Sequence, residues 1–194
     1  MISFNKDLFI FDTETTGLDP KIHRVVQIAG VLLDKHTLEE RWSFSENVYA
    51  SSKDIQYAHP KAMEKHNISP QTLSQATRWP IIWSRINKLL DREDYDIYGL
   101  NIQKFDIPMI NRMNEIYKQK DHWSREMIID LWPFFLVSGK LTNQGYARTG
   151  YSSLENIIKC FGIKCKQHDA LEDCLATAEA LRRMKSILGA GNKL

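Results

Sequence analysis

The chain of 194 residues is long enough for one α/β domain with a full hydrophobic core. Its net charge of only +2 is evidence against a protein that holds long nucleic-acid duplexes by charge alone. No apolar run approaches the roughly 20 residues that cross a bilayer, and three cysteines, an odd number, do not fit a disulfide framework, so we expect a cytoplasmic protein with no membrane contact.

The first predicted element is a strand that ends in two acidic residues. Four consecutive apolar residues, Leu8–Phe11, are typical of a strand that is buried on both faces. Side chains two positions apart in a strand point to the same side, so we expect Asp12 and Glu14 to project together. Two such carboxylates repel each other unless a cation lies between them, and oxygen ligands suit Mg²⁺ or Mn²⁺. The alternative is a strand that ends in two solvated acids.

Two further strands are predicted directly after the first. Residues 25–33 are almost entirely apolar, and residues 38–48 place large apolar side chains at even spacing. Residues 34–37 between them have the composition of a hairpin turn. Three strands in succession favour the antiparallel half of a sheet.

Helices are predicted next. Residues 59–70 indicate a short helix, and Ser69 followed by Pro70 is typical of the N-cap and first position of another. Pro80 opens a longer helix, for which helical spacing predicts a buried apolar stripe. The residues of this stripe are Ile82, Ile86, Leu89 and Leu90.

The second half of the chain alternates strands with helices. The predicted strands are 96–100 and 127–131, and the predicted helices are 106–117, 153–160 and 170–188. The polar, glycine-rich residues 138–150 predict a loop. Strands followed by alternating strands and helices indicate an α/β fold with a mixed sheet flanked by helices. We expect a single domain over residues 1–188 and a flexible tail at 189–194.

Further acids lie next to predicted helix starts. Asp106 follows the fourth predicted strand, and its alternative role is that of an N-cap for the next helix. Asp169 and Glu172 have the spacing of a variant capping box, which starts the last helix there. His168 then lies in the preceding loop and can converge with Asp173, whereas along one helix the two would lie about 140° apart. The alternative is a surface histidine and a solvated helix acid.

Three short motifs stand in the order that a known enzyme family uses. They are Asp12-Thr13-Glu14, the pattern Asn-x-x-x-Phe-Asp at residues 101–106, and the pattern His-x-Ala-x-x-Asp at residues 168–173. Together they resemble the motifs of the DEDDh branch of the DEDD superfamily of 3′→5′ exonucleases. These DnaQ-like enzymes include the proofreading exonuclease subunit of bacterial DNA polymerase III. The resemblance covers about residues 7–185, and the joint occurrence of three motifs makes it specific.

The resemblance implies an RNase H-like fold with a five-stranded mixed sheet, and it implies roles for single residues. The acids of the motifs would hold two divalent cations, Mg²⁺ or Mn²⁺, and His168 would act as the general base. These acids are Asp12, Glu14, Asp106 and Asp173.

The resemblance also implies a set of substrate-binding residues near these acids. They are Thr15, through its backbone, His66, Asn101 and Phe105. Phe105 is the candidate for stacking on the terminal base, and its alternative role is that of a core phenylalanine.

The predicted function is that of a metal-dependent 3′→5′ exonuclease. It would release nucleoside 5′-monophosphates from the 3′ end of nucleic acid, with single-stranded DNA as the first expectation. One alternative is a 3′→5′ exoribonuclease for short RNA or RNA 3′ ends, because no residue indicates a contact with the 2′-OH. Another is a nucleic-acid-binding or proofreading module within a polymerase or defence complex. A third, an RNase H-like endonuclease, is disfavoured by the histidine motif.

Overall fold

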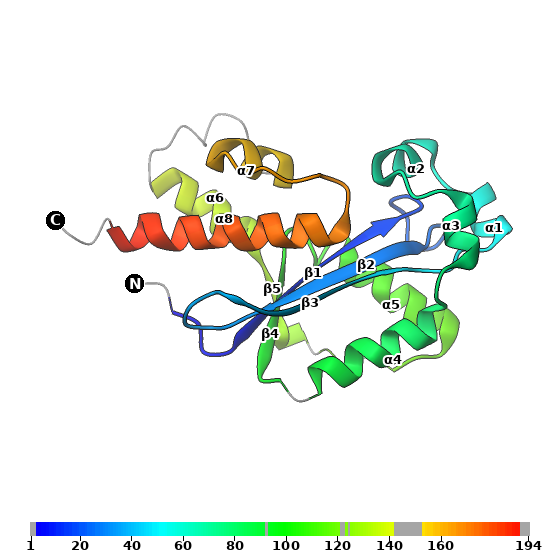
Figure 1. The fold of residues 1–194 in the computed structure, drawn as a ribbon, viewed down its shortest axis with the longest axis horizontal. Helices are drawn as coiled ribbons and strands as arrows, with labels where there is room; N and C mark the ends of the chain where they lie inside the picture. The colour runs from blue at the N-terminus through cyan, green and yellow to red at the C-terminus, as the bar shows by residue number, and fades with distance from the viewer. Residues whose placement is uncertain (1–2, 92, 121–122, 124, 142–152, 191–194) are drawn as a thin grey trace.

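The computed structural model describes residues 3–91, 93–120, 123, 125–141 and 153–190. Within them the chain forms a mixed sheet with helices on both faces (Figure 1). The strands are β1 (Asp7–Thr15), β2 (Val25–Leu33), β3 (Glu40–Asn47), β4 (Tyr95–Gly99) and β5 (Ile128–Asp130). Their order in the sheet is β3-β2-β1-β4-β5, which confirms the predicted five-stranded sheet.

The sheet is antiparallel on one side of β1 and parallel on the other. β2 and β3 extend it by antiparallel pairing, whereas β4 pairs parallel with β1 and β5 pairs parallel with β4. Every residue of β2 is buried, which accounts for its continuous apolar sequence.

The helices occupy both faces of the sheet and one of its ends. They are α1 (Ser52–Gln56), α2 (Pro60–His66), α3 (Pro70–Gln75), α4 (Trp79–Leu90), α5 (Asp106–Tyr117), α6 (Leu131–Leu141), α7 (Leu154–Phe161) and α8 (Ala170–Ala190), with a 3₁₀ turn at Arg125–Met127. Figure 1 shows α4 and α5 on one side of the sheet, α6, α7 and α8 on the other, and α1 to α3 together near the tip of β1.

The alternation of side chains along β1 divides the core into two clusters. Phe9 and Phe11 pack with residues of α4 and α5, whereas Leu8 and Ile10 pack with residues of α6, α7 and α8. The same alternation places the side chains that follow at even positions, those of residues 12 and 14, on the α8 side of the sheet.

β1 extends past the end of β4. The last residue of β1 that pairs with β4 is Ile10, opposite Tyr98, so the acidic end of β1 has an open edge. Gly99 ends β4 in a tight turn, where an added Cβ would lie 2.0 Å from Cγ2 of Ile102. This turn carries the chain back beside β1 and places the start of α5 at the open edge.

Most predicted helices form, and the differences have local causes. α1 was not predicted, because its five residues contain no buried side chain and only the capping box of Ser51 and Asp54 indicates it. α6 was not predicted either. It continues to Leu141, so the first residues of the predicted loop 138–150 are helical, and residues 142–150 lie outside the described residues.

Two smaller expectations differ from the structure. Leu89 is 43% exposed, because the buried stripe of α4 runs through Trp79 and Trp83 instead. Residues 189 and 190 of the predicted tail belong to α8, and residues 191–194 lie outside the described residues. No helix in the described part of the chain combines the length and the apolar character that a membrane span requires.

Candidate active site

One cavity lies where β1 extends past β4. Its volume is about 480 Å³. The predicted catalytic residues all line it: Asp12, Glu14, Asp106, His168 and Asp173. They come from β1, from the first turn of α5 and from the start of α8, so three separate segments of the sequence meet here.

The two acids of β1 project together into this cavity, as the strand pattern predicted. Burial raises the pKa of Asp12 well above its usual value, and the nearby carboxylates of Asp106 and Asp173 raise it further. Burial also raises the pKa of Glu14 to about 7, with contributions from the same two acids. The cavity therefore concentrates negative charge that a proton or a cation must offset.

Asp106 is held against the open edge of β1. Its Oδ1 accepts hydrogen bonds from the backbone N–H of Thr13 at 3.0 Å and from the Thr13 hydroxyl at 2.6 Å. Burial raises the pKa of Asp106 to about 7, and the bonds from Thr13 oppose this rise. The N-cap position of α5 is occupied by Phe105, without a side-chain capping bond, so the capping alternative for Asp106 does not hold.

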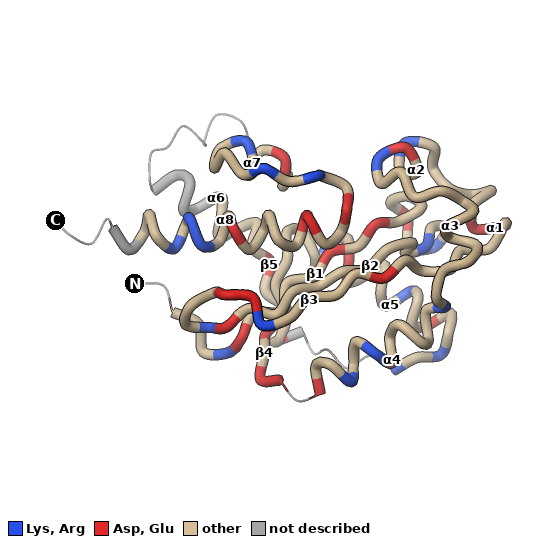
Figure 2. The backbone as a smooth tube through the Cα atoms, in the orientation of Figure 1, with Lys and Arg blue, Asp and Glu red and all other residues tan. Residues whose placement is uncertain are grey.

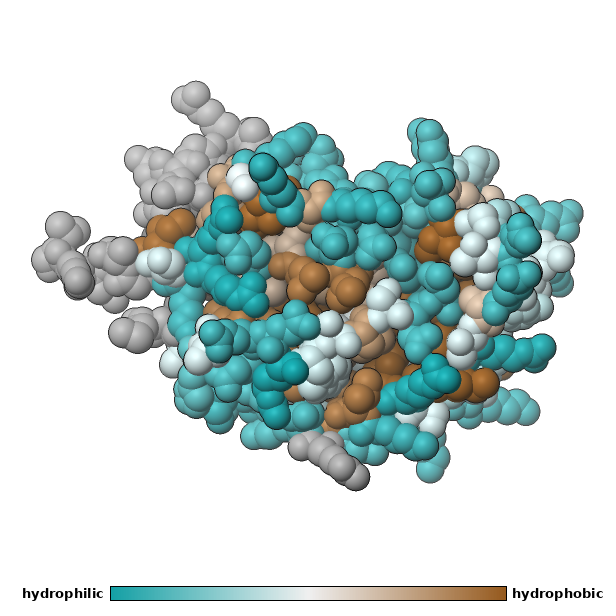
Figure 3. Space-filling model, viewed as in Figure 1, coloured by the Kyte–Doolittle hydropathy of each residue, from teal (hydrophilic) through white to brown (hydrophobic). Residues whose placement is uncertain are grey.

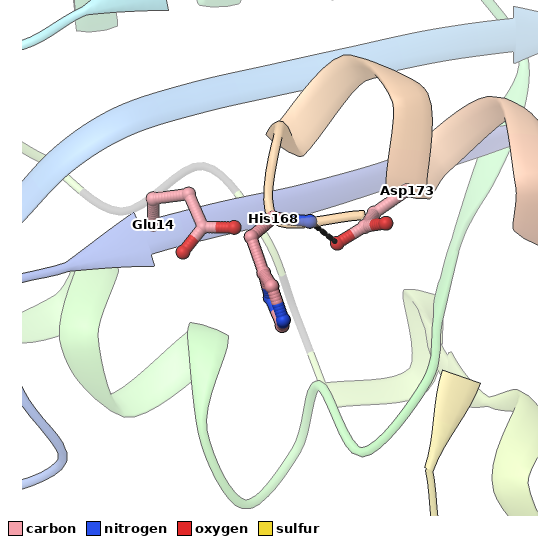
Figure 4. Close-up of side chains that lie close together, drawn as sticks. All are labelled: Glu14, His168 and Asp173. Carbon is pink, nitrogen blue, oxygen red and sulfur yellow. Dashed lines mark hydrogen bonds between the residues drawn. The ribbon is translucent and has the colours of Figure 1, made fainter. Parts of the chain in front are cut away.

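His168 and Asp173 lie together at the start of α8, and Figure 4 shows them beside Glu14. The backbone N–H of His168 donates to Oδ2 of Asp173 at 3.2 Å. His168 has a φ of +65°, which is uncommon for a residue other than glycine. This left-handed conformation lets the loop bend so that residues 168 and 173 meet, as their sequence positions predicted.

The beginning of α8 is fixed by two side chains. Oδ1 of Asp169 accepts hydrogen bonds from the N–H groups of Leu171 and Glu172, which confirms the predicted N-cap. The N–H of Ala170 donates to Oε1 of Gln27 at 2.9 Å, in a buried bond that ties the helix to β2. Gln27 lies opposite Glu14 in the β1–β2 register. The bond from Ala170 therefore fixes the start of α8 relative to the strand that carries Glu14.

The protonation states of His168 and Asp173 suit proton transfer. Burial raises the pKa of Asp173 to about 6, although the N–H of His168 opposes the rise. Burial and the nearby charge of Lys65 lower the pKa of His168. A neutral imidazole, which can accept a proton, therefore lies next to the acids near neutral pH.

A comparison with protein-family models identifies the family of this chain. The model RNase_T, described as "Exonuclease", matches residues 9–181. The chain belongs to this exonuclease family. The predicted DEDDh membership is thereby confirmed. A search of curated proteins found no match.

Solved structures of other exonucleases share the fold. A zinc-bound complex of Escherichia coli exonuclease I with single-stranded DNA has a TM-score of 0.81 and 21% identity, covering 94% of this chain and 41% of that one. An exonuclease I from Methylocaldum szegediense has a TM-score of 0.75 and 23% identity, over 92% and 40%. Cell-death related nuclease 4 has a TM-score of 0.72 and 16% identity, over 94% and 64%. The chain therefore spans about two fifths of the exonuclease I chains.

The donor atoms that line this cavity fit divalent cations. Ligand atoms of Glu14, His168 and Asp173 all lie within 4.8 Å of one another. Oδ1 of Asp173 is buried and has no hydrogen-bond partner in the described part of the chain. Carboxylate oxygens are the ligands that Mg²⁺ and Mn²⁺ prefer, and a cation would offset the repulsion that raises the pKa values of these acids.

The predicted substrate-binding residues fall into two groups. Asn101 and Phe105 line the cavity. Asn101 has a φ of +61°, and its N–H donates to Oδ1 of Asp130. Thr15 and His66 are buried and are not among the residues that line the cavity, so their contact with substrate stays a prediction.

Leu18 and Lys65 line the cavity and were missed by the sequence analysis. Leu18 is 80% exposed although it is apolar, and it follows the acidic end of β1 by a short turn. Its signal in the sequence was its place directly after Gly17, whose φ of +154° forms that turn. Lys65 lines the cavity from the last turn of α2, and its signal in the sequence was its place directly before the predicted substrate-binding residue His66.

Proposed function

We propose that this chain is a metal-dependent 3′→5′ exonuclease that removes nucleoside 5′-monophosphates from the 3′ end of single-stranded DNA. The observation that carries the proposal is the convergence of four motif acids and the motif histidine on one cavity. The structural similarity to exonuclease I in complex with single-stranded DNA supports DNA as the substrate.

The residues of the cavity take complementary roles in this proposal. Asp12, Glu14, Asp106 and Asp173 would hold two Mg²⁺ or Mn²⁺ ions. When bound, such ions supply an activated water and stabilise the charge that develops on the leaving oxygen. His168 takes the proton of the attacking water, a role that suits the neutral imidazole of this buried site.

Apolar side chains in the cavity wall support a single strand as the substrate. Leu18 is 80% exposed, Phe105 is partly buried against the core, and both line the cavity. Exposed apolar and aromatic side chains pack against any base, so they bind unpaired nucleotides without selecting a sequence. In a duplex the bases are stacked on each other and are less accessible to such contacts.

A labelled substrate tests the proposal directly. A 5′-labelled single-stranded DNA and its RNA counterpart are incubated with Mg²⁺, with Mn²⁺ and with EDTA. We expect a metal-dependent ladder that shortens from the 3′ end and is faster for DNA. Asp12→Asn should reduce it to background, because it removes a ligand charge. Glu39→Gln, the same loss of charge at an exposed position before β3, should leave the rate unchanged.

The other outcomes correspond to the other functions. A faster RNA ladder would identify an exoribonuclease. Binding of either strand without cleavage would favour a module within a polymerase or another nucleic-acid-processing complex, to be checked by co-purification. Cleavage of closed circular DNA would indicate an endonuclease.

A further inference from the structure

Lys65 brings a positive charge to a cavity otherwise dominated by carboxylates. It lies in the last turn of α2 and lines the cavity beside Glu14, His168 and Asp173. Its charge also acts on Glu155 of α7, the helix whose first residue Leu154 lines the cavity. Figure 3 shows the outline of the molecule notched between α7 and α2, and Figure 2 shows basic residues on α2 and acidic ones on β1 and at the start of α8.

The end of α2 is fixed by residues next to Lys65. His66 is buried, and its Nδ1 accepts a hydrogen bond from the N–H of Ile68 at 3.0 Å. Asn67 closes the helix in the left-handed conformation, with a φ of +55°. The side chain of Lys65 is exposed and forms no hydrogen bond or ion pair within the described part of the chain. Its backbone is therefore positioned while its ammonium group is available to a ligand.

The charge of the loaded cavity leaves a role for this ammonium group. Four carboxylates balance two divalent cations, so the cavity is nearly neutral before a substrate enters. A phosphodiester adds one negative charge, and a phosphate monoester carries about −1.5 to −2 at pH 7. A lysine ammonium offers three donors on a flexible stem and is a common phosphate-binding group.

We propose that Lys65 binds the phosphate at the cleaved bond and then the 5′-phosphate of the released nucleotide. The proposal rests on the proposed exonuclease function and adds a substrate-binding residue to it. It explains why a lysine in a cavity lined by acids is not paired with any of them.

Binding of the reaction product tests this role without turnover, because a nucleoside 5′-monophosphate is not cleaved further. Calorimetry with Mg²⁺ compares deoxyadenosine 5′-monophosphate with deoxyadenosine for the wild type and three variants. Lys65→Met keeps the stem and removes the charge, and we expect it to weaken binding of the monophosphate by about tenfold or more. Binding of the uncharged nucleoside should not change. Lys65→Arg should retain most of the affinity for the monophosphate.

Lys61→Met is the matched control. Lys61 is an exposed lysine of the same helix that does not line the cavity. An equal effect of Lys61→Met and Lys65→Met would overturn the proposal, because it would indicate a general effect of surface charge. The proposal would also fail if the wild type did not distinguish monophosphate from nucleoside, or if Lys65→Met weakened both equally.

The substrate offers a second measurement. Lys65→Met should raise KM for single-stranded DNA more than it lowers kcat, and it should reduce the slope of log KM against log salt by roughly 0.7, the value for one phosphate contact on a single strand. An active wild type with an unchanged Lys65→Met variant would contradict only the role of Lys65. A wild type that cleaves neither DNA nor RNA would contradict the exonuclease proposal itself.

Discussion

The sheet side and the helix side of the cavity are fixed by different means. On the sheet side, Asp12 and Glu14 are placed by the paired register of β1 and β2, in which each strand residue has a defined partner. Asp106 is added to this side by two hydrogen bonds from Thr13, one of them from the backbone. The positions of these acids therefore follow from regular structure.

The helix side depends on fewer and more irregular contacts. His168 stands in a loop with a left-handed backbone, and its imidazole has no strand or helix to orient it. The loop is held by its own N–H bond to Asp173 and by the bond from Ala170 to Gln27. We infer that this side tolerates less change, because each contact has no regular neighbour to replace it.

Removal of the imidazole should cause the largest effect after loss of a metal ligand. His168→Asn is preferred to alanine, because asparagine tolerates the left-handed conformation and keeps the backbone N–H bond to Asp173. We expect kcat to fall by about 10²–10⁴-fold, the usual contribution of a general base. Circular dichroism and the melting temperature should match the wild type. A rate within a fewfold of the wild type would show that another group accepts the proton.

Deleting one hydrogen bond on each side compares the two sides directly. Gln27→Leu removes the acceptor for Ala170 and should lower kcat by about 10–100-fold, the cost of losing a contact that orients a ligand. Thr13→Val removes the hydroxyl bond to Asp106 but keeps the backbone bond, so we expect only a fewfold decrease.

Melting temperatures separate positioning from general destabilisation. Gln27→Leu should stay fully folded at the assay temperature, so that its lower kcat reflects the lost bond to Ala170. If Thr13→Val lowered kcat as strongly as Gln27→Leu, the inferred difference between the two sides would be wrong.

The same contrast explains what the sequence predicts. The apolar run of β1 and the spacing of Asp12 and Glu14 predict that both acids share one side, because the strand period alone decides it. The cap at Asp169 likewise predicts where α8 begins and that His168 precedes it. Local patterns of this kind need no knowledge of the remaining chain.

Other features of the cavity depend on contacts between distant segments. The bond from Ala170 to Gln27 joins residues 143 positions apart, and no local pattern indicates it. The choice between a cap and a site acid at Asp106 depends on where β4 ends relative to β1, which is a property of strand pairing. Leu18 and Lys65 likewise line the cavity only because the turn after β1 and the end of α2 meet at the tip of β1.

The smallest predicted effect is a pH dependence of stability that comes mainly from the acids. In the metal-free fold the pKa values of Glu14 and Asp106 are about 7 and that of Asp173 is about 6, whereas unfolded acids titrate near pH 4. Between about pH 4 and pH 7 the folded chain therefore binds more protons than the unfolded chain. The stability that this difference contributes is fully present below about pH 4 and is lost as pH rises through 6–7.

Thermal melts of the metal-free protein check this sign. The melting temperature should fall between pH 5 and pH 8, with about 2–4 °C expected per kcal/mol for a chain of this size. Mg²⁺ or Mn²⁺ should raise it more at pH 8 than at pH 5, because the cations bind the ionised acids. Asp12→Asn should stabilise the metal-free protein at pH 8, since it removes a carboxylate whose pKa is raised by burial and by its neighbours. A melting temperature that increases with pH would mean that these carboxylates are not crowded together in the folded protein.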